Sequence, residues 1–298
     1  MGEIIDKDLI KINEMLKEQI GDFSYKKVER LGGLTNHNYY VALENGRELV
    51  FRIPGDGTED IISREDERKS TKLACNLKID AKCIYFGQDG SKITEYIKNP
   101  VTMDASELKK VNHMKEIVEI LSTLHRSGID TAVRFDVFEM AKKYEKSINK
   151  HNVFMYDDYN IVKDIVSNIK SEIASICDIA LVPCHNDPLC ENWVYGNSRM
   201  YLIDWEYAGM NDGMWDLADV SIEAGYDTKL DEELLTMYFG EKPNKNRLKL
   251  FYANKIYVDY LWTLWAKARI PFEGQSMETW ARERYERLKQ NIEIFKSL

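Results

Sequence analysis

The pattern of apolar residues changes near Asn99-Pro100, and this change constrains the fold more than any other feature of the chain. Before this point, short apolar runs alternate with turn signals. Asn45-Gly46 lies between two such runs and is a strong hairpin signal, because both turn positions favour positive φ. After it, long segments carry apolar residues at helical spacing. The sequence therefore predicts an α+β protein with a small antiparallel-sheet lobe, residues 1–98, and a larger, mostly helical lobe, residues 99–298.

Within the first lobe, the spacing predicts a helix that ends near Ile20 and a second helix over residues 61–76. The predicted strands of this lobe are Tyr25–Leu31, Asn38–Leu43, Glu48–Ile53, Cys83–Phe86 and Ser91–Ile97. In the second lobe, Asp104 followed by Glu107 resembles a capping box and predicts a helix to about His125. Helical patterns return from about Asp231 to the end of the chain.

Composition excludes several classes of protein. The net charge is −9 with no run of Lys or Arg, which argues against a nucleic-acid-binding protein. No apolar stretch approaches the roughly 20 residues needed to span a bilayer, so we expect no membrane insertion. The five cysteines contain no Cys-x-x-Cys pair, which argues against a disulfide framework or a structural zinc site. We therefore expect a cytoplasmic protein with reduced thiols.

The segment His185–Asn192, followed by Leu202–Glu206, carries the clearest chemical signal. Asp187 and Asn192 are five residues apart, and Asp204 follows about a dozen residues later. This is the catalytic spacing of protein-kinase-like folds, in which the first Asp receives the proton of the substrate hydroxyl. The Asn and the second Asp hold Mg²⁺ on the ATP phosphates, because Mg²⁺ prefers hard oxygen ligands.

The first lobe contains matching candidates for binding phosphate. The turn Leu31–Asn36 lies between two predicted strands, where the glycines, including Gly33, allow close backbone approach, and Thr35 and Asn36 offer donors. Arg52 lies in the strand after the Asn45-Gly46 turn, where a cation could contact phosphates. Glu67 on the following helix is the candidate partner of Arg52, and Glu65 is a rival.

With these pieces in place, the chain resembles the choline/ethanolamine kinases of the bacterial choline kinase type, within the aminoglycoside-phosphotransferase-like group. Besides the segments above, the resemblance rests on further runs, which are Phe51–Gly55, Ser63–Glu67, Lys92–Ile97, Leu202–Asp212, Asp216–Ala218 and Trp262–Trp265. It spans about residues 25–285. Ser63 departs from the Asn that relatives often carry there, and we expect no effect.

The resemblance implies a two-lobed protein-kinase-like fold and a set of roles. Asp187 would be the catalytic base, with His185 bracing its loop. Asn192 and Asp204 would hold Mg²⁺, and Arg52, paired with Glu67, would contact the ATP phosphates. The adenine would lie against the backbone of Glu95, Tyr96 and Ile97. If residues 202–206 form a strand, Asp204 and Glu206 share a face, so Glu206 is either a further metal ligand or a structural carboxylate.

The acceptor pocket is expected in the second lobe, which contains all six tryptophans. The predicted helix Phe251–Arg269 has a narrow polar stripe of Lys255, Asp259, Thr263 and Lys267 and is otherwise mostly apolar, so it is buried or lines a pocket. A quaternary ammonium cannot donate N–H hydrogen bonds, so its recognition relies on aromatic faces and a carboxylate. The resemblance assigns Trp262 and Trp265 to such a cage, Glu223 and Tyr226 to its acidic and tyrosine positions, and Trp280 as a candidate to close it. Without the resemblance, these tryptophans would be interpreted as core.

The sequence thus predicts a choline kinase that uses ATP and Mg²⁺, with small-molecule substrates. Ethanolamine kinase is the nearest alternative, and the tryptophan pair favours choline over it. An aminoglycoside-type phosphotransferase would need an acidic, open pocket instead. A catalytically inactive nucleotide-binding scaffold is disfavoured because Asp187, Asn192, Asp204 and Arg52 are all present.

Overall fold

The computed structural model describes residues 5–21, 24–31, 36–55 and 63–298. The chain forms two compact units, and each unit is built from two separate stretches of sequence. The first unit comprises Met1–Met103 and Glu191–Ala208, and the second comprises Asp104–Cys190 and Gly209–Leu298. The sequence predicted one boundary, between residues 98 and 99. The structure differs in assigning Glu191–Ala208 to the first unit.

This assignment has a physical cause in strand pairing. Strand β6 (Val101–Thr102) pairs with β8 (Trp193–Gly196), which pairs in turn with β9 (Arg199–Leu202), and all three are antiparallel neighbours in one sheet. The amide of Leu202 donates to the carbonyl of Ile79 at 3.2 Å. A small apolar cluster joins the same segments and contains Ala81, Ile97, Val194 and Tyr201. Pairing over such sequence separations leaves no signal in local periodicity.

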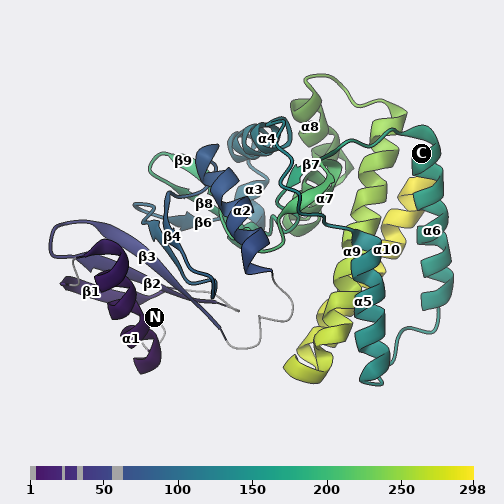
Figure 1. Ribbon diagram of the computed structural model, residues 1–298. Coiled ribbons are helices and arrows are strands. Elements are labelled where there is room, and N and C mark those ends of the chain that lie inside the picture. Colours follow the sequence, from purple (N-terminus) through teal and green to yellow (C-terminus); the bar gives the residue numbers. More distant parts are fainter. Residues whose placement is uncertain (1–4, 22–23, 32–35, 56–62) are drawn as a thin grey trace. The chain divides into compact units, whose positions relative to one another are not determined.

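The main sheet of the first unit confirms the predicted antiparallel lobe. Its strands are β1 (Tyr25–Arg30), β2 (Asn36–Leu43), β3 (Glu48–Pro54), β4 (Cys83–Phe86) and β5 (Lys92–Glu95), in the order β1-β2-β3-β5-β4 (Figure 1). The hairpin between β2 and β3 turns at Asn45-Gly46, and Gly46 has φ of 85°. The predicted hairpin is therefore confirmed, but positive φ occurs at Gly46 alone and not at Asn45.

Helices flank this sheet. Helix α1 (Asp6–Met15) continues into a π-helical turn, η1 (Leu16–Ile20), and buries Ile12 and Leu16 against Tyr39 and Phe51 of the sheet. Helix α2 (Arg64–Asn76) begins after Ser63, whose side chain accepts a hydrogen bond from the amide of Asp66 at 3.4 Å. Ser63 is therefore a working N-cap in this chain.

The second unit is mainly helical. Its helices are α3 (Ala105–Leu108), α4 (Val111–His125), α5 (Val137–Lys150), α6 (Tyr159–Ile176), α7 (Met214–Ala224), α8 (Thr228–Phe239), α9 (Lys245–Glu273) and α10 (Ser276–Ser297). This unit also contains a two-stranded sheet of β7 (Leu181–Cys184) and β10 (Gly209–Asp212). The short helix η2 (Cys190–Asn192) begins at Cys190 of this unit, and its other two residues belong to the first unit. The predicted cap at Asp104 and helix end at His125 are confirmed, but the segment forms two helices, because α3 ends after one turn and α4 starts anew at Val111.

Helix α9 is the centre of this unit and packs against α5, α6, α7 and α10 (Figure 1). Its polar stripe is buried, and the three charged residues of the stripe are paired. Lys255 contacts Asp231 at 2.9 Å, Lys267 contacts Glu278 at 2.6 Å, and Asp259 accepts hydrogen bonds from Arg287. A buried charge is costly unless it is paired, so these contacts explain how a helix with charged residues can lie inside the unit.

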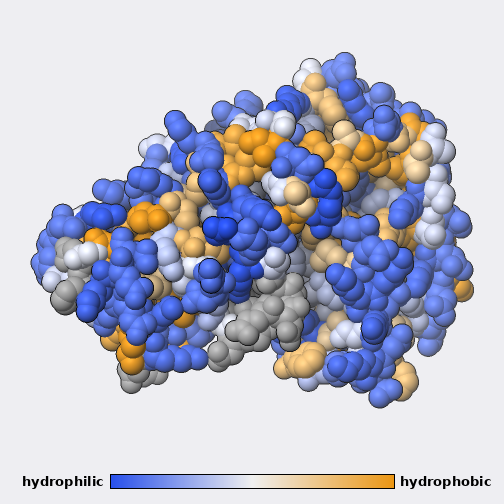
Figure 2. Space-filling model, in the orientation of Figure 1, coloured by the Kyte–Doolittle hydropathy of each residue, from blue (hydrophilic) through white to orange (hydrophobic). Residues whose placement is uncertain are grey.

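Apolar residues gather inside the units, and the face seen in Figure 2 is largely hydrophilic. Among the described helices, none combines the length and the apolar character needed to cross a bilayer.

Candidate active site

A buried ion pair between Arg52 and Glu67 anchors the first part of the site. Arg52 lies on β3 with 4% of its surface exposed, and Glu67 lies on α2 with 1% exposed. Nη1 of Arg52 pairs with Oε1 of Glu67, and Nη1 of Arg64 donates to Oε2 at 2.8 Å. Burial raises the pKa of Glu67, but Arg52, Lys92 and Arg64 together outweigh burial and the net pKa is lowered. The rival Glu65 instead pairs with Arg68 at 2.7 Å on the exposed side of the helix.

A glycine completes the support of Arg52. Nη2 of Arg52 donates to the carbonyl of Gly90 at 2.8 Å. Gly90 has φ of 86°, and a Cβ atom there would lie 2.6 Å from Cδ of Arg64. A side chain at this position would therefore be strained and would also displace the Arg64 side chain.

Two further carboxylates lie beside these arginines. Nη1 of Arg52 is 3.8 Å from Oδ1 of Asp204, and Nη1 of Arg64 is 3.9 Å from Oε2 of Glu206. Asn36, at the start of β2, donates to Oε2 of Glu206 at 3.4 Å. Burial, followed by the charge of Asp204, raises the pKa of Glu206 to about 7. The negative charges of Asp204 and Glu206 therefore oppose each other, and a bound cation would relieve this repulsion.

Residues 202–206 do not form a strand, so the condition for placing Asp204 and Glu206 on one strand face is not met. Strand β9 ends at Leu202, and Asp204 has φ of 68°, a left-handed conformation that strands do not contain. Trp205 is buried and its Nε1 donates to the carbonyl of Leu202 at 3.1 Å, which fixes the turn. Asp204 and Glu206 thus approach the arginines from a tight turn, and the period-two argument does not apply. A non-glycine residue in this conformation costs on the order of 1 kcal/mol and is common at functional sites.

The donor set fits a divalent cation such as Mg²⁺. Oδ1 of Asp204 is buried and has no hydrogen-bond partner among the described residues. The carbonyl of Asn192 accepts the amide of Ile203 at 2.9 Å, which ties Asn192 to the same turn. Asn192, Asp204 and Glu206 offer only hard oxygen ligands, as Mg²⁺ requires.

The predicted nucleotide-contacting segments are only partly described. Gly33 and Thr35 lie outside the described residues. The amide of Glu95 donates to the carbonyl of Lys82 at 2.9 Å, and the amide of Tyr96 donates to the carbonyl of Glu48 at 3.1 Å. The amide of Ile97 has no hydrogen bond within the described parts of the chain. Of these three predicted positions, Ile97 therefore retains an unused amide donor.

The loop that carries Asp187 is held by Asp216, on α7. The amides of His185 and Asn186 donate to Oδ2 and Oδ1 of Asp216, each at 2.8 Å. Nε1 of Trp215 donates to the carbonyl of Asn186 at 3.0 Å, and Nδ1 of His185 accepts the amide of Asp187 at 3.3 Å. Asp187 is only partly buried, so a rigid loop presents its carboxylate.

Sequence reasoning missed several supporting residues. Asp216 is part of the Asp216–Ala218 segment that carries the family resemblance. Its hydrogen bonds to the loop of Asp187 could not be predicted from the spacing of residues in the sequence. Nε2 of His125 lies 3.0 Å from Oδ2 of Asp216 and supports it from α4. Tyr144 on α5 lies near Asp187, since burial and then the charge of Asp187 raise the pKa of its hydroxyl. Arg64 lies in the segment Ser63–Glu67, which carries the resemblance, but the sequence alone assigned it no role.

The tryptophans of the predicted cage form a row across α9 and α10. The ring centroids of Trp262 and Trp265 are 6.1 Å apart, and those of Trp265 and Trp280 are 5.7 Å apart, both in edge-to-face geometry. The hydroxyl of Tyr226 donates its hydrogen bond to the carbonyl of Leu108, so its proton is not free to be donated to a ligand.

The predicted acidic position is also occupied. Oε1 of Glu223 pairs with Nη2 of Arg284. The guanidinium of Arg284 lies 3.8 Å from the centre of the Trp280 ring, which is a cation–π contact. An internal cation therefore already engages one carboxylate and one aromatic face of the predicted cage.

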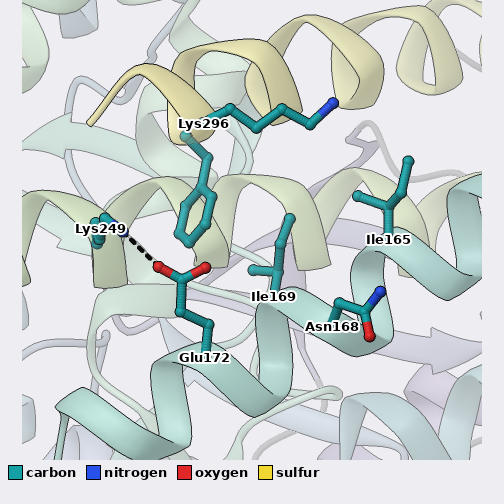
Figure 3. A pocket seen from close by; sticks show the side chains of 7 residues that line it. Ile165, Asn168, Ile169, Glu172, Lys249 and Lys296 are labelled. Atoms are coloured by element: carbon teal, nitrogen blue, oxygen red, sulfur yellow. Dashed lines mark hydrogen bonds and ion pairs between the residues drawn. The ribbon is translucent and has the colours of Figure 1, made fainter.

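A separate pocket contains none of the predicted site residues. It lies among α6, α9 and α10, and its lining residues are Ile165, Asn168, Ile169, Glu172, Lys249, Phe295 and Lys296. Figure 3 shows Lys249 directed at Glu172, with which it forms an ion pair. The charge of Lys249 is thus already balanced.

Comparison with known proteins gives consistent matches over nearly the whole chain. The sequence pattern described as choline/ethanolamine kinase matches residues 28–296. A solved choline/ethanolamine kinase family protein from Mesorhizobium loti is 30% identical, with a TM-score of 0.84 and coverage of 96% of this chain and 95% of that chain. Protein LicA of Haemophilus influenzae is 28% identical over 247 residues, which are 80% of this chain and 72% of that protein.

The choline kinase LicA from Streptococcus pneumoniae is 29% identical, with a TM-score of 0.80 and coverage of 96% of this chain and 99% of that chain. LicA has also been solved in complex with AMP, and that structure is 29% identical to this chain with a TM-score of 0.75 and coverage of 95% and 99%. The similarity includes both units of the fold.

Proposed function

Because the chain belongs to the choline/ethanolamine kinase family, we propose that it transfers the γ-phosphoryl group of MgATP to the hydroxyl of choline, giving phosphocholine and ADP. The observation that carries the choice of choline is the row of Trp262, Trp265 and Trp280. A trimethylammonium group offers no N–H donors, and aromatic faces are the groups that attract it.

The nucleotide would be held by residues of the first unit. Arg52, fixed by Glu67 and Gly90, has the charge and the support to contact phosphates. Asn192, Asp204 and Glu206 would hold Mg²⁺, which when bound neutralises the charge on the phosphates. The unused amide of Ile97 would hydrogen-bond the adenine, alongside Glu95 and Tyr96. Gly33, Thr35 and Asn36 would cover the phosphates through their backbone and side-chain donors.

The acceptor would be activated by the second unit. Asp187 would orient the choline hydroxyl and accept its proton, since a carboxylate on a rigid loop is suited to positioning a nucleophile. Asp216 would maintain that loop without contacting substrate. The tryptophan row of α9 and α10 would surround the ammonium group, together with Glu223 on α7 and Tyr226, which follows α7 in sequence.

The direct test is release of ADP from MgATP with choline, ethanolamine and an aminoglycoside assayed in parallel, with Asp187→Ala as the negative control. We expect strong turnover of choline, weak turnover of ethanolamine and none of the aminoglycoside. Preference for ethanolamine would retain the phosphotransferase chemistry and assign the tryptophans to the core. Equal ADP release by Asp187→Ala would remove Asp187 from the mechanism.

A further inference from the structure

A stripe of lysines runs along the exposed side of α5. Lys143, Lys146 and Lys150 are exposed and follow each other at steps of three and four residues, so they share one face of the helix. None of these three lysines forms an ion pair with a residue that the structure describes. The two acids of α5, Glu139 and Glu145, pair with other lysines, each at 2.6 Å. The charge of the stripe is therefore not balanced by its own helix.

The segments next to the stripe add little negative charge. Asp157, between α5 and α6, is exposed and forms no ion pair within the described parts of the chain. The following residue, Asp158, pairs with Lys289 at 3.4 Å, and Arg269 near the end of α9 donates to Glu273 at 2.7 Å. Three lysines without an ion pair therefore exceed one such acid. This part of the second unit is positive, although the net charge of the chain is −9.

Two exposed phenylalanine rings lie near the end of the same stripe. Phe154 follows α5 with 89% of its surface exposed, and Phe272 in the last turn of α9 is 63% exposed. The ring of His151, directly after α5, has its centre 5.3 Å from that of Phe272, and Nζ of Lys267 on α9 donates to the carbonyl of Phe154 at 2.8 Å. Figure 2 shows hydrophobic side chains among hydrophilic ones at the lower edge of this unit, where α5 and α9 end in Figure 1.

The backbone that carries Phe154 is held in place. Lys267 is buried, and its Nζ also pairs with Glu278 at 2.6 Å. The amide of Val153 donates to the carbonyl of Ile148 at 3.1 Å. An anchored segment thus presents a large apolar ring to water, and the free energy of that ring falls when a partner covers it.

We propose that this surface, formed by Lys143, Lys146, Lys150, Phe154 and Phe272 and here called the α5 end face, docks the protein on an anionic phospholipid membrane. The lysines would lie at the negatively charged headgroups, and the two rings would enter the boundary between headgroups and acyl chains. The protein would lie on the membrane, and no helix would cross it. The proposal does not depend on the proposed function and adds a place of action to it.

Two properties of the α5 end face favour a membrane over an acidic protein as its partner. A protein partner would need a pocket shaped for each of the two rings, whereas lipids rearrange around an inserted apolar side chain. The net charge of −9 repels the molecule as a whole from anionic headgroups, so a local positive face would also set the orientation in which the protein approaches. Lysine side chains suit this position, because their apolar stems can lie along the surface while the ammonium groups reach the headgroups.

The first experiment measures binding of the whole protein to lipid vesicles by flotation. The vesicles contain either phosphatidylcholine alone or equal parts of phosphatidylcholine and phosphatidylglycerol. Saturating choline is present throughout, so that lipid headgroups do not bind at the acceptor site. At low salt, the wild-type protein should bind the anionic vesicles at least about tenfold more tightly than the neutral ones, and high salt should remove most of this difference. Equal binding to both kinds of vesicle at low salt would overturn the proposal.

The second experiment tests the lysines. The triple variant Lys143→Gln, Lys146→Gln, Lys150→Gln should bind anionic vesicles at least about tenfold more weakly, because each lysine near such a surface contributes roughly fivefold. The matched control changes to Gln three exposed lysines on α4, on α8 and after α8, which are Lys115, Lys229 and Lys242. The control alters the net charge equally and should keep the wild-type binding. Equal losses in the two triple variants would mean that only net charge matters, which would overturn the proposal.

The third experiment tests the rings. The double variant Phe154→Ala, Phe272→Ala should bind anionic vesicles about fivefold more weakly or less tightly still, since membrane affinity scales with the apolar area that is buried. This loss should be similar at each salt concentration, because salt screens charges and not apolar burial. All the variants should melt at the wild-type temperature, since the substituted side chains are exposed. Wild-type binding by the double variant would overturn the role of the rings and with it the proposed docking.

Discussion

At the scale of single residues, the site depends on which charges are partnered. Arg52 is almost fully buried and is stable there because Glu67 faces it. Removal of one member of a buried ion pair leaves an uncompensated charge, which costs about 3–5 kcal/mol. A nearby exposed pair, such as Glu65 with Arg68, contributes roughly 0–1 kcal/mol. Two glutamates on one helix are therefore expected to respond very differently to the same substitution.

Glu67→Gln should raise the KM for ATP at least about tenfold and lower the melting temperature, because Arg52 loses the carboxylate that fixes it. Glu65→Gln is the matched control and should change both quantities little. Steady-state kinetics with varied ATP and thermal melting measure the two effects. Similar kinetics in the two variants would show that the ion pair is not needed for nucleotide binding.

Trp262→Ala should raise the KM for choline about tenfold or more and leave the KM for ATP within about twofold, since a desolvated cation–π contact contributes about 1–2 kcal/mol. Trp262→Phe, which keeps an aromatic face, should lie between the wild type and the alanine variant. The two KM values are measured by varying each substrate in turn. Equal changes for choline and ATP would make Trp262 a core residue.

At the scale of elements, the loop before η2 owes its shape to α7. The carboxylate of Asp216 accepts hydrogen bonds from the amides of His185 and Asn186, which precede Asp187. No other side chain among the described residues accepts from both of these amides. Asp216→Asn keeps one acceptor oxygen and loses the second, so we expect kcat to fall about 100-fold while nucleotide affinity changes little.

The control for Asp216→Asn is Asp227→Asn. Asp227 caps α8 by accepting the amides of Lys229 and Leu230, and Asn caps a helix about as well as Asp does. Its kcat should stay at the wild-type value. A fall in nucleotide affinity equal to the fall in kcat in Asp216→Asn would indicate general unfolding.

Elements whose shape depends on the residues within them could be predicted from the sequence. Elements whose shape depends on contacts with residues far away in the sequence could not. The hairpin at Asn45-Gly46 could be predicted because Gly46 readily adopts the positive φ that the turn uses, and β4 was predicted with its exact bounds. The turn at Asp204 could not be predicted, because its positive φ is maintained by Trp205 and the surrounding arginines.

The same distinction holds for the candidate site. The identities of Arg52, Asp187 and Asp204 were visible as a spaced pattern with a chemical reason. The pairing of Glu223 with Arg284 joins residues far apart in sequence and depends on how α7 packs in the helical unit. No local pattern distinguishes a carboxylate that is free to bind a ligand from one that an arginine already occupies.

At the scale of the whole molecule, the chain passes between the two units three times, after Met103, Cys190 and Ala208. A fragment ending at Met103 therefore lacks β8 and β9, and β6 has no partner strand. Apolar residues Ala81 and Ile97 would also lose Val194 and Tyr201.

We expect a fragment of residues 1–103 to be partly unfolded, with weak protection of β6 and of the Ile97 region from hydrogen exchange. The same fragment joined through a flexible linker to residues 191–208 should regain that protection. Hydrogen exchange on the two polypeptides measures the difference. Equal protection in both would show that the first stretch folds without the β8–β9 hairpin.

The split of the first unit also has a consequence for the order in which the protein can mature during synthesis. A ribosome releases the sheet strands β1 to β5 first, yet the last part of that unit is not made until Ala208 has been added. Much of the helical unit emerges in between. The first unit is therefore incomplete, and exposed to aggregation, while much of the second unit is being synthesised. A pause in translation before residue 208 would prolong the time that the first unit spends incomplete.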